Sequence, residues 1–412
     1  MRILHVNIKD NLGAGTAAYR MHKALLKSNV DSTMLVMDKS IDDDTIVNLN
    51  KNNYHRLLTK LFIQLEKLHL RIYKKRENVI FSGSEYSRNY VKQINKINPD
   101  VVHFHWINKG FFSLGQIVKI KAPVVFSLHD MWLFTGGCHY SNNCRKYMKE
   151  CGDCIILKSN RQNDFSRKLY KRKQRIFSKK NELWVVGLSK WMADCAKKSS
   201  LLKKEQVVQL PNCIDVDTYK PVNKESTRKK YNLPTDKKLI MFGAMSSTSD
   251  RRKGFKELVD TILKLPDDKF ELVIFGADSS QDIERLPAKA HFMGHISDYK
   301  IMIELYSMAD ITIVPSLEEN LSNVIMESLC CGSPVAGFGI GGNSDMVKSG
   351  YNGYLAKPYD TEELAKGIES IIFNTETQKH YSDNARNYIL NNFNEGNIAL
   401  RYIELYNIIT AK

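Results

Sequence analysis

The stretch ITIVPSLEENLSNVIMESLCCGSPVAGFG (311–339) contains the local pattern from which the fold can be inferred. A β-branched run, ITIVPS, precedes a mostly apolar helical pattern, and PVAGFG returns to strand character. Ser322 or Asn323 can cap the helix, and Gly332 can end it before Pro334 forces an extended chain. A strand, a helix and a strand in this order are typical of a parallel α/β unit.

The same alternation of strand and helix patterns occurs in two successive sets along the 412 residues, a length that fits two domains. In the first set we expect strands at 2–8, 32–37, 100–105, 123–129, 183–189 and 207–212. In the second set we expect strands at 238–244, 270–277, 290–296, 311–316, 334–339 and 352–357. The polar stretch 219–237 is the predicted linker. The predicted fold class is therefore α/β, with two doubly wound, Rossmann-like domains whose ligands bind at the carboxyl ends of the strands.

The composition is that of a globular chain, with 43% hydrophobic and 26% charged residues. No apolar run approaches the ~20 residues of a membrane span, and the amino-terminal residues lack a secretory pattern. We therefore expect a cytoplasmic protein.

The positive charge is concentrated in the first half. Residues 1–220 hold 39 Lys and Arg against 19 Asp and Glu (39 − 19 = +20), and residues 221–412 hold 22 against 26 (22 − 26 = −4). The densest run, at 158–180, interleaves basic residues with Phe165, Leu169, Ile176 and Phe177. It indicates either a solvated helix face or a patch that contacts anionic lipid head groups at the inner face of the plasma membrane. No zinc-finger, RNP or helix-turn-helix pattern supports nucleic acid as a partner.

A glycine loop, GAGTAA (13–18), follows the first strand and resembles the dinucleotide fingerprint, with Asp38 at a suitable distance. The fingerprint needs its first glycine at the end of the strand, but here the strand is expected to end at Ile8 and four residues intervene. Gly13 and Gly15 therefore favour a contact with phosphate or sugar, and a plain tight turn is the alternative.

Acidic residues lie on both sides of the helix start in the opening stretch. The first-turn N–H groups of Leu321, Ser322 and Asn323 form a site that suits phosphate oxygens. Glu319 precedes that site and Glu327 follows two turns later, and carboxylates accept hydrogen bonds from vicinal hydroxyl groups. This arrangement favours a nucleotide-activated sugar, with Glu319 on the sugar and Glu327 on the ribose.

Four cysteines, Cys138, Cys144, Cys151 and Cys154, follow the spacing C-x5-C-x6-C-x2-C in a stretch that is too polar to predict a core. Structural zinc would stabilise such a loop, and reversible disulfides are the alternative. The remaining cysteines, at 195, 213, 330 and 331, are expected to be small core residues.

The E-x7-E pattern at Glu319 and Glu327, followed by CGSPVA, resembles the donor-site signature of retaining glycosyltransferases of family 4, which have the GT-B fold. Further matching stretches span most of the chain: the glycine loop, SLHD (127–130), GLSKWM (187–192), LPNCIDVDTYKP (210–221), RRKGF (251–255), GHISD (294–298) and NGYLAKP (352–358). HFHWINKGFFS together with LHDMWLFTGGCHYSNNC is most similar to the bacterial branch that builds polysaccharides such as colanic acid and O-antigen.

This resemblance implies roles for individual residues. Lys253 would neutralise charge on the donor diphosphate, His129 would lie near the reacting sugar, and Ile296 would mark the base-binding strand end. The family usually has an arginine at the position of Ala244, and Arg251 or Arg252 could replace it. The expected catalytic residues are His129, Lys253 and Glu319. The expected donor contacts are Gly13, Gly15, Arg252, Lys253, Ile296, Glu319, Asn320, Leu321, Ser322, Asn323 and Glu327.

The resemblance also implies the domains and the reaction. We expect an acceptor domain at 1–218 with a Cys-rich loop at 136–156, a donor domain at 219–380, and helices at 381–412 that cross back to the first domain. A UDP- or GDP-sugar would donate its sugar, with retention, to a hydroxyl of a lipid-linked saccharide, without a catalytic metal or cofactor. The alternatives are a sugar phosphorylase, a nucleotide-sugar epimerase, a glycosidase, or a zinc-stabilised module that binds lipid or nucleic acid.

Overall fold

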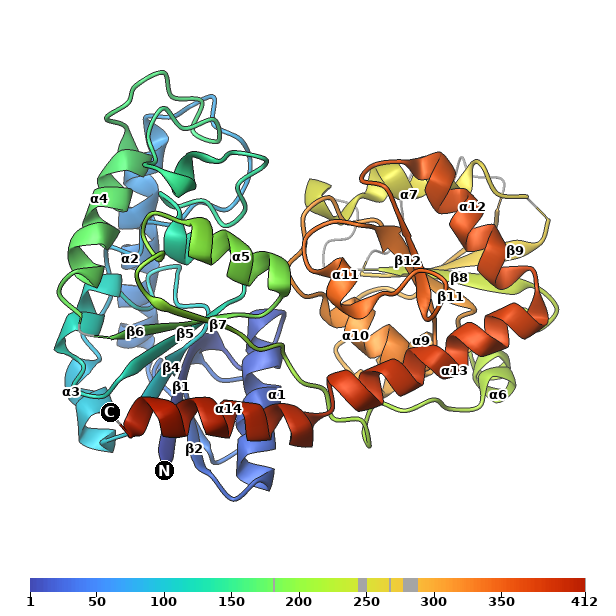
Figure 1. Ribbon diagram of the computed structural model, residues 1–412, viewed down its shortest axis with the longest axis horizontal. Coiled ribbons are helices and arrows are strands. Elements are labelled where there is room, and N and C mark those ends of the chain that lie inside the picture. The colour runs from blue at the N-terminus through green and yellow to red at the C-terminus, as the bar shows by residue number, and fades with distance from the viewer. Residues whose placement is uncertain (181, 244–249, 267, 277–287, 412) are drawn as a thin grey trace. The chain divides into compact units, whose positions relative to one another are not determined.

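The computed structural model describes residues 1–180, 182–243, 250–266, 268–276 and 288–411 (Figure 1). The chain forms two compact units, of which the first combines Met1–Cys213 with Gly396–Lys412 and the second is Ile214–Glu395. The divisions therefore lie at 213 and 395, whereas the expected ones lay at 218 and 380. As a result, the last two helices belong to different units: α13 (Thr375–Asn392) to the second and most of α14 (Glu395–Thr410) to the first.

The first unit contains a parallel sheet in the order β3-β2-β1-β4-β5-β6-β7. Its strands are β1 (Arg2–Lys9), β2 (Asp31–Asp38), β3 (Ile46–Asn48), β4 (Val101–Phe104), β5 (Val124–Leu128), β6 (Leu183–Gly187) and β7 (Gln206–Gln209). Each of the six strands expected in this half is present. The edge strand β3 was not expected, because three residues are too few to show a strand periodicity.

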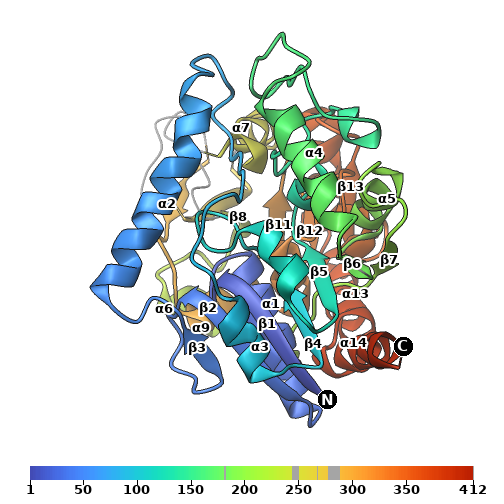
Figure 2. The ribbon, with the colours of Figure 1, turned by 90° about the vertical axis from the view of Figure 1, so that its left-hand side faces the viewer.

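Helices surround this sheet (Figure 2). They are α1 (Ala14–Lys27), α2 (Asn53–Arg71), α3 (Val91–Ile97), α4 (Phe165–Phe177), α5 (Lys190–Lys198) and the carboxyl-terminal α14, and the 3-10 turns are η1 (Leu114–Lys119), η2 (Trp132–Phe134) and η3 (Lys146–Met148). Within the described ranges, none of the helices combines the length and the apolar character needed to cross a bilayer.

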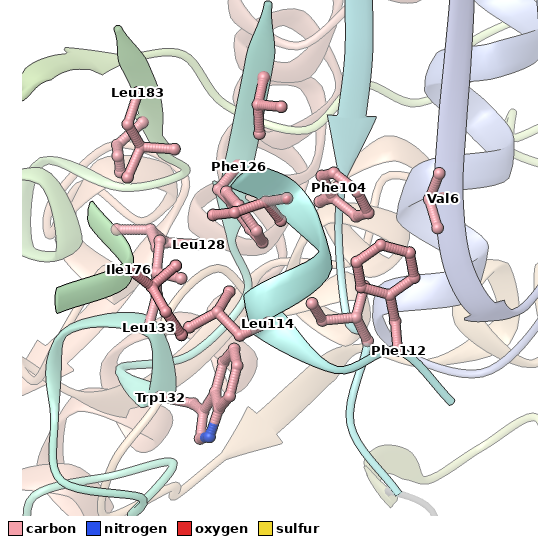
Figure 3. Packing of buried hydrophobic residues seen from close by; sticks show 14 of the residues in the cluster. Val6, Phe104, Phe112, Leu114, Phe126, Leu128, Trp132, Leu133, Ile176 and Leu183 are labelled. Atoms are coloured by element: carbon pink, nitrogen blue, oxygen red, sulfur yellow. The ribbon is translucent and has the colours of Figure 1, made fainter. Parts of the chain in front are cut away.

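The core of the first unit packs against one face of the sheet (Figure 3). The Phe104 ring lies 4.9 Å from that of Phe112 and 5.0 Å from that of Phe126, between centroids, and η1, η2 and α4 add further apolar side chains. Aromatic and aliphatic side chains of this size contribute about 1.5–3 kcal/mol each when fully buried.

Helix α4 fits the first interpretation of the basic run at 158–180, a helix with one solvated face, because Lys168, Lys171 and Arg175 are exposed. Its apolar residues are all buried in the unit, namely Phe165, Leu169, Ile176 and Phe177. Lys173 is also buried and donates hydrogen bonds to the carbonyl oxygens of Trp132 and Thr135. Burial lowers the pKa of Lys173 to about 7. The run is thus an amphipathic helix packed on the core, and its apolar residues are not available to a membrane.

The second unit contains a parallel sheet in the order β10-β9-β8-β11-β12-β13. Its strands are β8 (Lys238–Gly243), β9 (Phe270–Phe275), β10 (Ala290–Phe292), β11 (Ile311–Val314), β12 (Val335–Phe338) and β13 (Gly353–Ala356). Its helices are α6 (Lys224–Lys230), α7 (Phe255–Ile262), α9 (Tyr299–Met308), α10 (Asn323–Cys330), α11 (Asn343–Met346), α12 (Thr361–Ile372) and α13, with a 3-10 turn, η4 (Arg251–Lys253). Both sheets reverse their strand order next to the first strand of the unit, as in a doubly wound fold.

The predicted linker at 219–237 is a folded part of the second unit and contains α6. Arg228, in this helix, forms an ion pair with Asp310 at 2.6 Å, and both side chains are 5% exposed. Asp310 also pairs with Lys224 at 2.6 Å. The stretch is therefore a folded part of the second unit, and Arg228 and Lys224 tie it to Asp310.

Candidate active site

A tight turn in the second unit positions Lys253. Gly254 ends η4 with φ +74°, and a Cβ atom added there would lie 1.8 Å from the carbonyl oxygen of Pro315. The Leu317 amide donates to the Arg252 carbonyl oxygen at 2.7 Å. The glycine in RRKGF is therefore needed because the turn lies directly against the loop after β11, which carries the acidic residues.

Lys253 and Glu319 meet at this contact. The Lys253 Nζ atom lies 2.8 Å from the Glu319 Oε2 atom, and the Glu319 side chain is buried. Burial alone would raise the pKa of Glu319, but the charge and hydrogen bond of Lys253, with a contribution from Arg252, outweigh it and hold the pKa below its ordinary value. The fold therefore brings together two of the expected catalytic residues, Glu319 as a buried carboxylate and Lys253 as its counter-ion.

A second glycine turn, which we did not expect as part of the site, encloses Glu319 from the strand β12 side. A Cβ atom added at Gly341, where φ is +50°, would lie 1.8 Å from the Glu319 carbonyl oxygen, and the Gly342 amide donates to that oxygen at 3.2 Å. The signal in the sequence is the GFGIGG run at 337–342, which begins in the last residues of β12, since several glycines at a strand end indicate a close backbone approach.

Helix α10 begins at the expected position. Of the two candidate caps, Ser322 is the N-cap, and its side chain accepts from the Ile325 amide at 3.5 Å. Asn320, Leu321 and Ser322 are buried, and Asn323 is partly exposed. The backbone that opens the helix follows Glu319 directly in the chain.

Glu327 occupies the second turn of α10 and is partly exposed. The Tyr306 hydroxyl, from α9, donates to its Oε2 atom at 3.1 Å. Burial raises the pKa of Tyr306, so the phenol remains protonated and can act as this donor. The sequence did not indicate that Tyr306 would orient Glu327, because the contact joins two different helices.

The two arginines expected near the diphosphate are both paired with acids. Arg251 donates to both carboxylate oxygens of Glu257 at 2.6 Å, and Arg252 lies 2.6 Å from an oxygen of Asp250. Ala244, where the family usually has arginine, lies outside the described residues.

Ile296 is not at the end of a strand as expected. Strand β10 ends at Phe292, although the Met293 amide still donates to the Ile274 carbonyl oxygen at 2.8 Å. Ile296 follows in a partly exposed loop before α9. Gly294 has φ +62°, and its carbonyl oxygen still accepts from the Gly276 amide at 2.8 Å, so contact with the chain of β9 continues just beyond the regular strand.

His129, the remaining expected catalytic residue, follows β5 in the first unit. Its Nε2 atom lies 3.0 Å from the Nδ1 atom of His105. Burial lowers the pKa of His129 to about 4, although the neighbouring Asp130 opposes this shift, so the ring is neutral near pH 7. The imidazole therefore acts there as a hydrogen-bonding group without charge.

Asp130 organises the residues around His129. Its Oδ2 atom accepts from the Trp106 indole at 2.9 Å and lies 2.6 Å from the Nδ1 atom of His139. Burial alone would raise the pKa of Asp130, but its interactions, led by that with His139, hold the pKa below its ordinary value. SLHD and GGCHY both contain residues of this network, but only the fold shows that they meet.

Three further histidines form a buried row that the sequence did not single out. His5 in β1 is paired in register with His103 in β4, and the His5 Nδ1 atom lies 2.9 Å from the Nε2 atom of His105. The Nδ1 atom of His103 lies 2.6 Å from the Tyr406 hydroxyl of α14. Alternate histidines in VVHFH were the available signal, since positions i and i+2 of a strand share one face.

The glycine loop after β1 has a structural explanation. Gly13 is the N-cap residue of α1 with φ +45°. A Cβ atom added at Gly15 would lie 2.7 Å from the Lys9 carbonyl oxygen, so the close packing of helix on strand requires glycine there. Strand β1 extends to Lys9, and three residues still separate it from Gly13. This geometry fits a tight turn, and a ligand contact stays a prediction.

The polar Cys-rich loop is less exposed than expected. Cys138 and Cys151 are buried, and burial raises the pKa of both thiols, for Cys151 to about 12. In the part of the chain that is described, the one group of three metal-ligating side chains with atoms within 4.8 Å of one another is His5, His103 and His105. The four cysteines do not form such a group, and structural zinc stays a prediction. Of the other cysteines, 213, 330 and 331 are buried as expected, and Cys195 is partly exposed.

Two family models match this chain, one in each half. The family model "Glycosyltransferase Family 4" matches residues 13–218, and the model "Glycosyl transferases group 1" matches residues 223–388. The chain belongs to glycosyltransferase family 4. It is therefore a glycosyltransferase of the GT-B type, with the family match in the first half and the group 1 match in the half that carries Lys253 and Glu319.

Curated relatives include two uncharacterised glycosyltransferases of Methanocaldococcus jannaschii. One is 31% identical over 152 residues, which are 34% of this chain and 38% of the relative. The other is 24% identical over 325 residues, which are 75% of each chain. An N-acetyl-alpha-D-glucosaminyl L-malate synthase of Bacillus anthracis is 23% identical over 216 residues, covering 50% of this chain and 55% of the relative.

Solved structures share the whole fold at low identity. Sucrose-phosphate synthase from Thermosynechococcus elongatus aligns with a TM-score of 0.70 and 17% identity, over 100% of this chain and 99% of the other. HepE from Anabaena in complex with UDP-glucose aligns with a TM-score of 0.64 and 15% identity, over 98% and 99%. WaaG, a glycosyltransferase involved in lipopolysaccharide biosynthesis, aligns with a TM-score of 0.62 and 14% identity, over 100% of both chains.

Proposed function

We propose that the chain transfers a sugar from a UDP- or GDP-sugar to a hydroxyl group of a lipid-linked saccharide, with retention of the anomeric configuration. The observation that carries this proposal is the 2.8 Å ion pair between Lys253 and Glu319 directly before α10. A lysine, a buried carboxylate and a helix start meet there, and together they suit a ligand with a diphosphate next to a polyol.

In this proposal the ion pair occupies the donor site until the donor binds. The diphosphate takes over the Lys253 ammonium group, and the Glu319 carboxylate then accepts hydrogen bonds from the sugar hydroxyls. The low pKa of Glu319 keeps it ionised for this purpose. Lys253 exchanges Glu319 for the diphosphate, and Glu319 exchanges Lys253 for the sugar hydroxyls. Neither charge is then left buried without a partner, which would cost about 3–5 kcal/mol.

The other donor contacts follow from the same arrangement. The backbone from Asn320 to Asn323 faces the diphosphate, Glu327 holds the ribose with Tyr306 as its support, and Ile296 lies near the base. Arg252 serves the diphosphate only if it leaves Asp250. UDP is supported by the UDP-glucose complex of HepE, which shares the fold.

In the chemical step the bond between the anomeric carbon and the phosphate oxygen breaks, and a bond to the acceptor oxygen forms on the same face. The acceptor proton passes to a phosphate oxygen of the leaving nucleoside diphosphate. Lys253 stabilises the charge that develops on that leaving group. His129, with its neutral imidazole, is the catalytic residue that the family resemblance implies in the first unit.

A lipid-linked acceptor in surface polysaccharide synthesis, such as O-antigen, is supported by the similarity of 103–144 to that bacterial branch and by the basic first half of the chain. WaaG, described as a lipopolysaccharide glycosyltransferase, has the same fold. Such an acceptor would bring the protein to the inner face of the plasma membrane.

The test is a thermal-shift screen of nucleotide sugars followed by a transfer assay with the donor that binds. We expect one UDP- or GDP-sugar to stabilise the protein and Glu319→Gln to lower turnover by about 100-fold or more. Glu318→Gln is the matched control, because it removes the adjacent acid.

Several outcomes would contradict the proposal. Cleavage of an aryl glycoside without any nucleotide would indicate a glycosidase, and sugar 1-phosphate as the product would indicate a phosphorylase. Conversion of the donor without an acceptor, or an inverted product by NMR, would also contradict it.

A further inference from the structure

Helix α2 of the first unit is anchored along one face only. Thr59 donates to the Asn50 side chain at 3.3 Å, and a Cβ atom added at Gly110 would lie 3.0 Å from the Cβ atom of Phe62. Near the end of the helix, the His69 ring stacks on Phe165 with 4.9 Å between centroids, and the Tyr73 hydroxyl just beyond it accepts from the Phe165 amide at 2.9 Å. These contacts fix which side of the helix faces the unit.

The opposite face of α2 carries a row of exposed apolar side chains. The row consists of Tyr54, Leu57, Leu61 and Leu68 in α2 and of its C-cap residue Ile72, and these side chains are between 46% and 75% exposed. Their spacing of three, four, seven and four residues places them along one stripe of a helix. Thr59 is the single buried residue among the 19 residues of α2. Isolated exposed leucines are common on protein surfaces, but an aligned row of this length marks an interaction site.

A row of basic side chains runs beside the apolar row. Arg56, Lys60, Lys67 and Arg71 are all exposed, and each directly precedes a member of the apolar row. One residue is a rotation of about 100° in a helix, so the basic row flanks the apolar row on one side. Residues 53–76 hold seven Lys and Arg and one acid, Glu66 (7 − 1 = +6).

Glu66 does not oppose this charge at the surface. It lies on the anchored face, where its side chain accepts from the Glu85 amide at 3.2 Å. Burial raises its pKa to about 7, so its negative charge is reduced near neutral pH. The exposed face of α2 therefore presents apolar and positive groups without an acidic one.

An anionic lipid bilayer matches this face better than a second copy of the chain does. Two α2 helices packed on each other would bring their basic rows together, whereas a bilayer offers acyl chains to the apolar row and phosphates to the basic row. A helix of this length spans about 28 Å when it lies flat. Helix α4 offers no comparable surface, because its apolar residues are buried.

We propose that α2 docks the protein on anionic membranes, with Tyr54, Leu57, Leu61, Leu68 and Ile72 among the acyl chains. Arg56, Lys60, Lys67 and Arg71 then contact the lipid phosphates. Only the purpose of this docking, to bring the enzyme to a lipid-linked acceptor, rests on the proposed function. The docking itself requires neither donor nor acceptor.

Vesicle co-sedimentation of the full chain tests the proposal, with vesicles of phosphatidylcholine alone and of phosphatidylcholine with 30 mol% phosphatidylglycerol, that is, roughly one anionic lipid in three. We expect binding to the anionic vesicles and little to the neutral ones. The variant Leu57→Gln/Leu61→Gln/Leu68→Gln should weaken binding by about 10-fold or more. Its matched control, Leu263→Gln/Leu400→Gln/Ile408→Gln, changes three exposed apolar residues elsewhere and should bind as the parent does.

A second pair of variants separates the two basic stretches at equal charge. Arg56→Gln/Lys60→Gln should weaken binding clearly more than Lys168→Gln/Lys171→Gln on α4, and all four residues are exposed. Equal losses would mean that only net charge matters and would overturn the role of α2. If the parent protein does not bind anionic vesicles, the role of α2 is overturned as well.

Light scattering tests whether a second copy of the chain, instead of a membrane, covers the apolar row of α2. A dimer that the triple leucine variant converts to a monomer would show that a second copy covers the stripe and would overturn lipid docking. Donor turnover with a water-soluble acceptor should be unchanged in that variant. If the parent protein docks on anionic vesicles but transfers no sugar, the docking surface stands and the proposed function fails. If the parent protein transfers sugar but does not dock, the proposed function stands and the docking surface fails.

Discussion

The two units share one sheet topology, but they handle charge at their strand ends in opposite ways. In the second unit, Lys253 and Glu319 meet as a pair of ions at the start of α10. In the first unit, His129 lies beside the buried row of His5, His103 and His105, and desolvation lowers the pKa of all four rings. The difference shows that the fold sets where a ligand can bind, whereas a few residues at the strand ends decide whether the site is ionic or neutral.

The largest expected effect concerns the buried ion pair that supports the second unit. Arg228→Met leaves Asp310 with a poorly compensated charge, and we expect a loss of about 3–5 kcal/mol in the free energy of unfolding. Lys229→Met is the control, because Lys229 is 67% exposed and its pair with Glu225 contributes little.

This variant can also show whether the units unfold separately. All four tryptophans, 106, 132, 184 and 191, lie in the first unit. Circular dichroism in urea should therefore report an early transition of the second unit that tryptophan fluorescence does not follow. Coincident transitions would mean that the two units unfold as one.

The neutral histidines predict that the first unit loses stability in mild acid. The folded-state pKa is about 3 for His103 and about 4 for His129 and for His22, a buried residue of α1, and burial is the main cause of each shift below the ordinary value of 6.5. Stability from these groups is thus present above pH 6.5 and decreases as pH falls toward 4. Between pH 6.5 and 5.5 we expect roughly 1 kcal/mol for each, on the order of 3 kcal/mol in total.

The measurement is urea unfolding followed by tryptophan fluorescence at pH 7.5, 6.5 and 5.5. A midpoint that does not move over this range would contradict neutral burial of the histidines. NMR of labelled histidine should show the His129 ring still uncharged at pH 5.5.

A smaller free-energy effect is expected at the ionic site. Lys253→Met should lower kcat by about 100-fold, equivalent to about 3 kcal/mol, because the leaving diphosphate loses its cation. It should also raise the pKa of Glu319, which loses its counter-ion. Lys256→Met on the exposed side of α7 is the control. Unchanged turnover with the nucleotide sugar would remove Lys253 from the mechanism.

The smallest effect concerns the support of Glu327. Tyr306→Phe removes one hydrogen bond worth about 1 kcal/mol. We therefore expect the KM for the donor to rise roughly 5-fold with little change in kcat. Tyr299→Phe, at an exposed position of the same helix, is the control. A fall in kcat instead would place Tyr306 nearer the reacting atoms than the ribose.

Most of the fold could be predicted because parallel strands are short apolar runs separated by helical patterns, and each expected strand was found. The exceptions have local causes. The three residues of β3 are too few to show a pattern, and β10 ends at Phe292, before the expected position. Helix α6 was read as a linker because its buried contact is made by a charged residue, Arg228. Sequence periodicity records which side chains are apolar, but it does not record which charges are paired.

The candidate site was predictable where one segment supplies it and less so where several do. Ser322 as a possible cap and the two glutamates follow from one contiguous stretch. The Gly341 turn, Tyr306 and the histidine row come from segments far apart in sequence, and only the packed sheet brings them together. Burial was the least predictable property, as α4 and the two buried cysteines of the Cys-rich loop show.

The return of α14 to the first unit has a consequence for synthesis of the chain. Domains generally fold in order from the amino terminus as they leave the ribosome. Here Tyr402 and Tyr406, which cover His103, are translated after the entire second unit. The first half therefore stays incomplete until its last residues arrive, and a nascent or prematurely terminated polypeptide would expose a bare imidazole surface to chaperones and proteases.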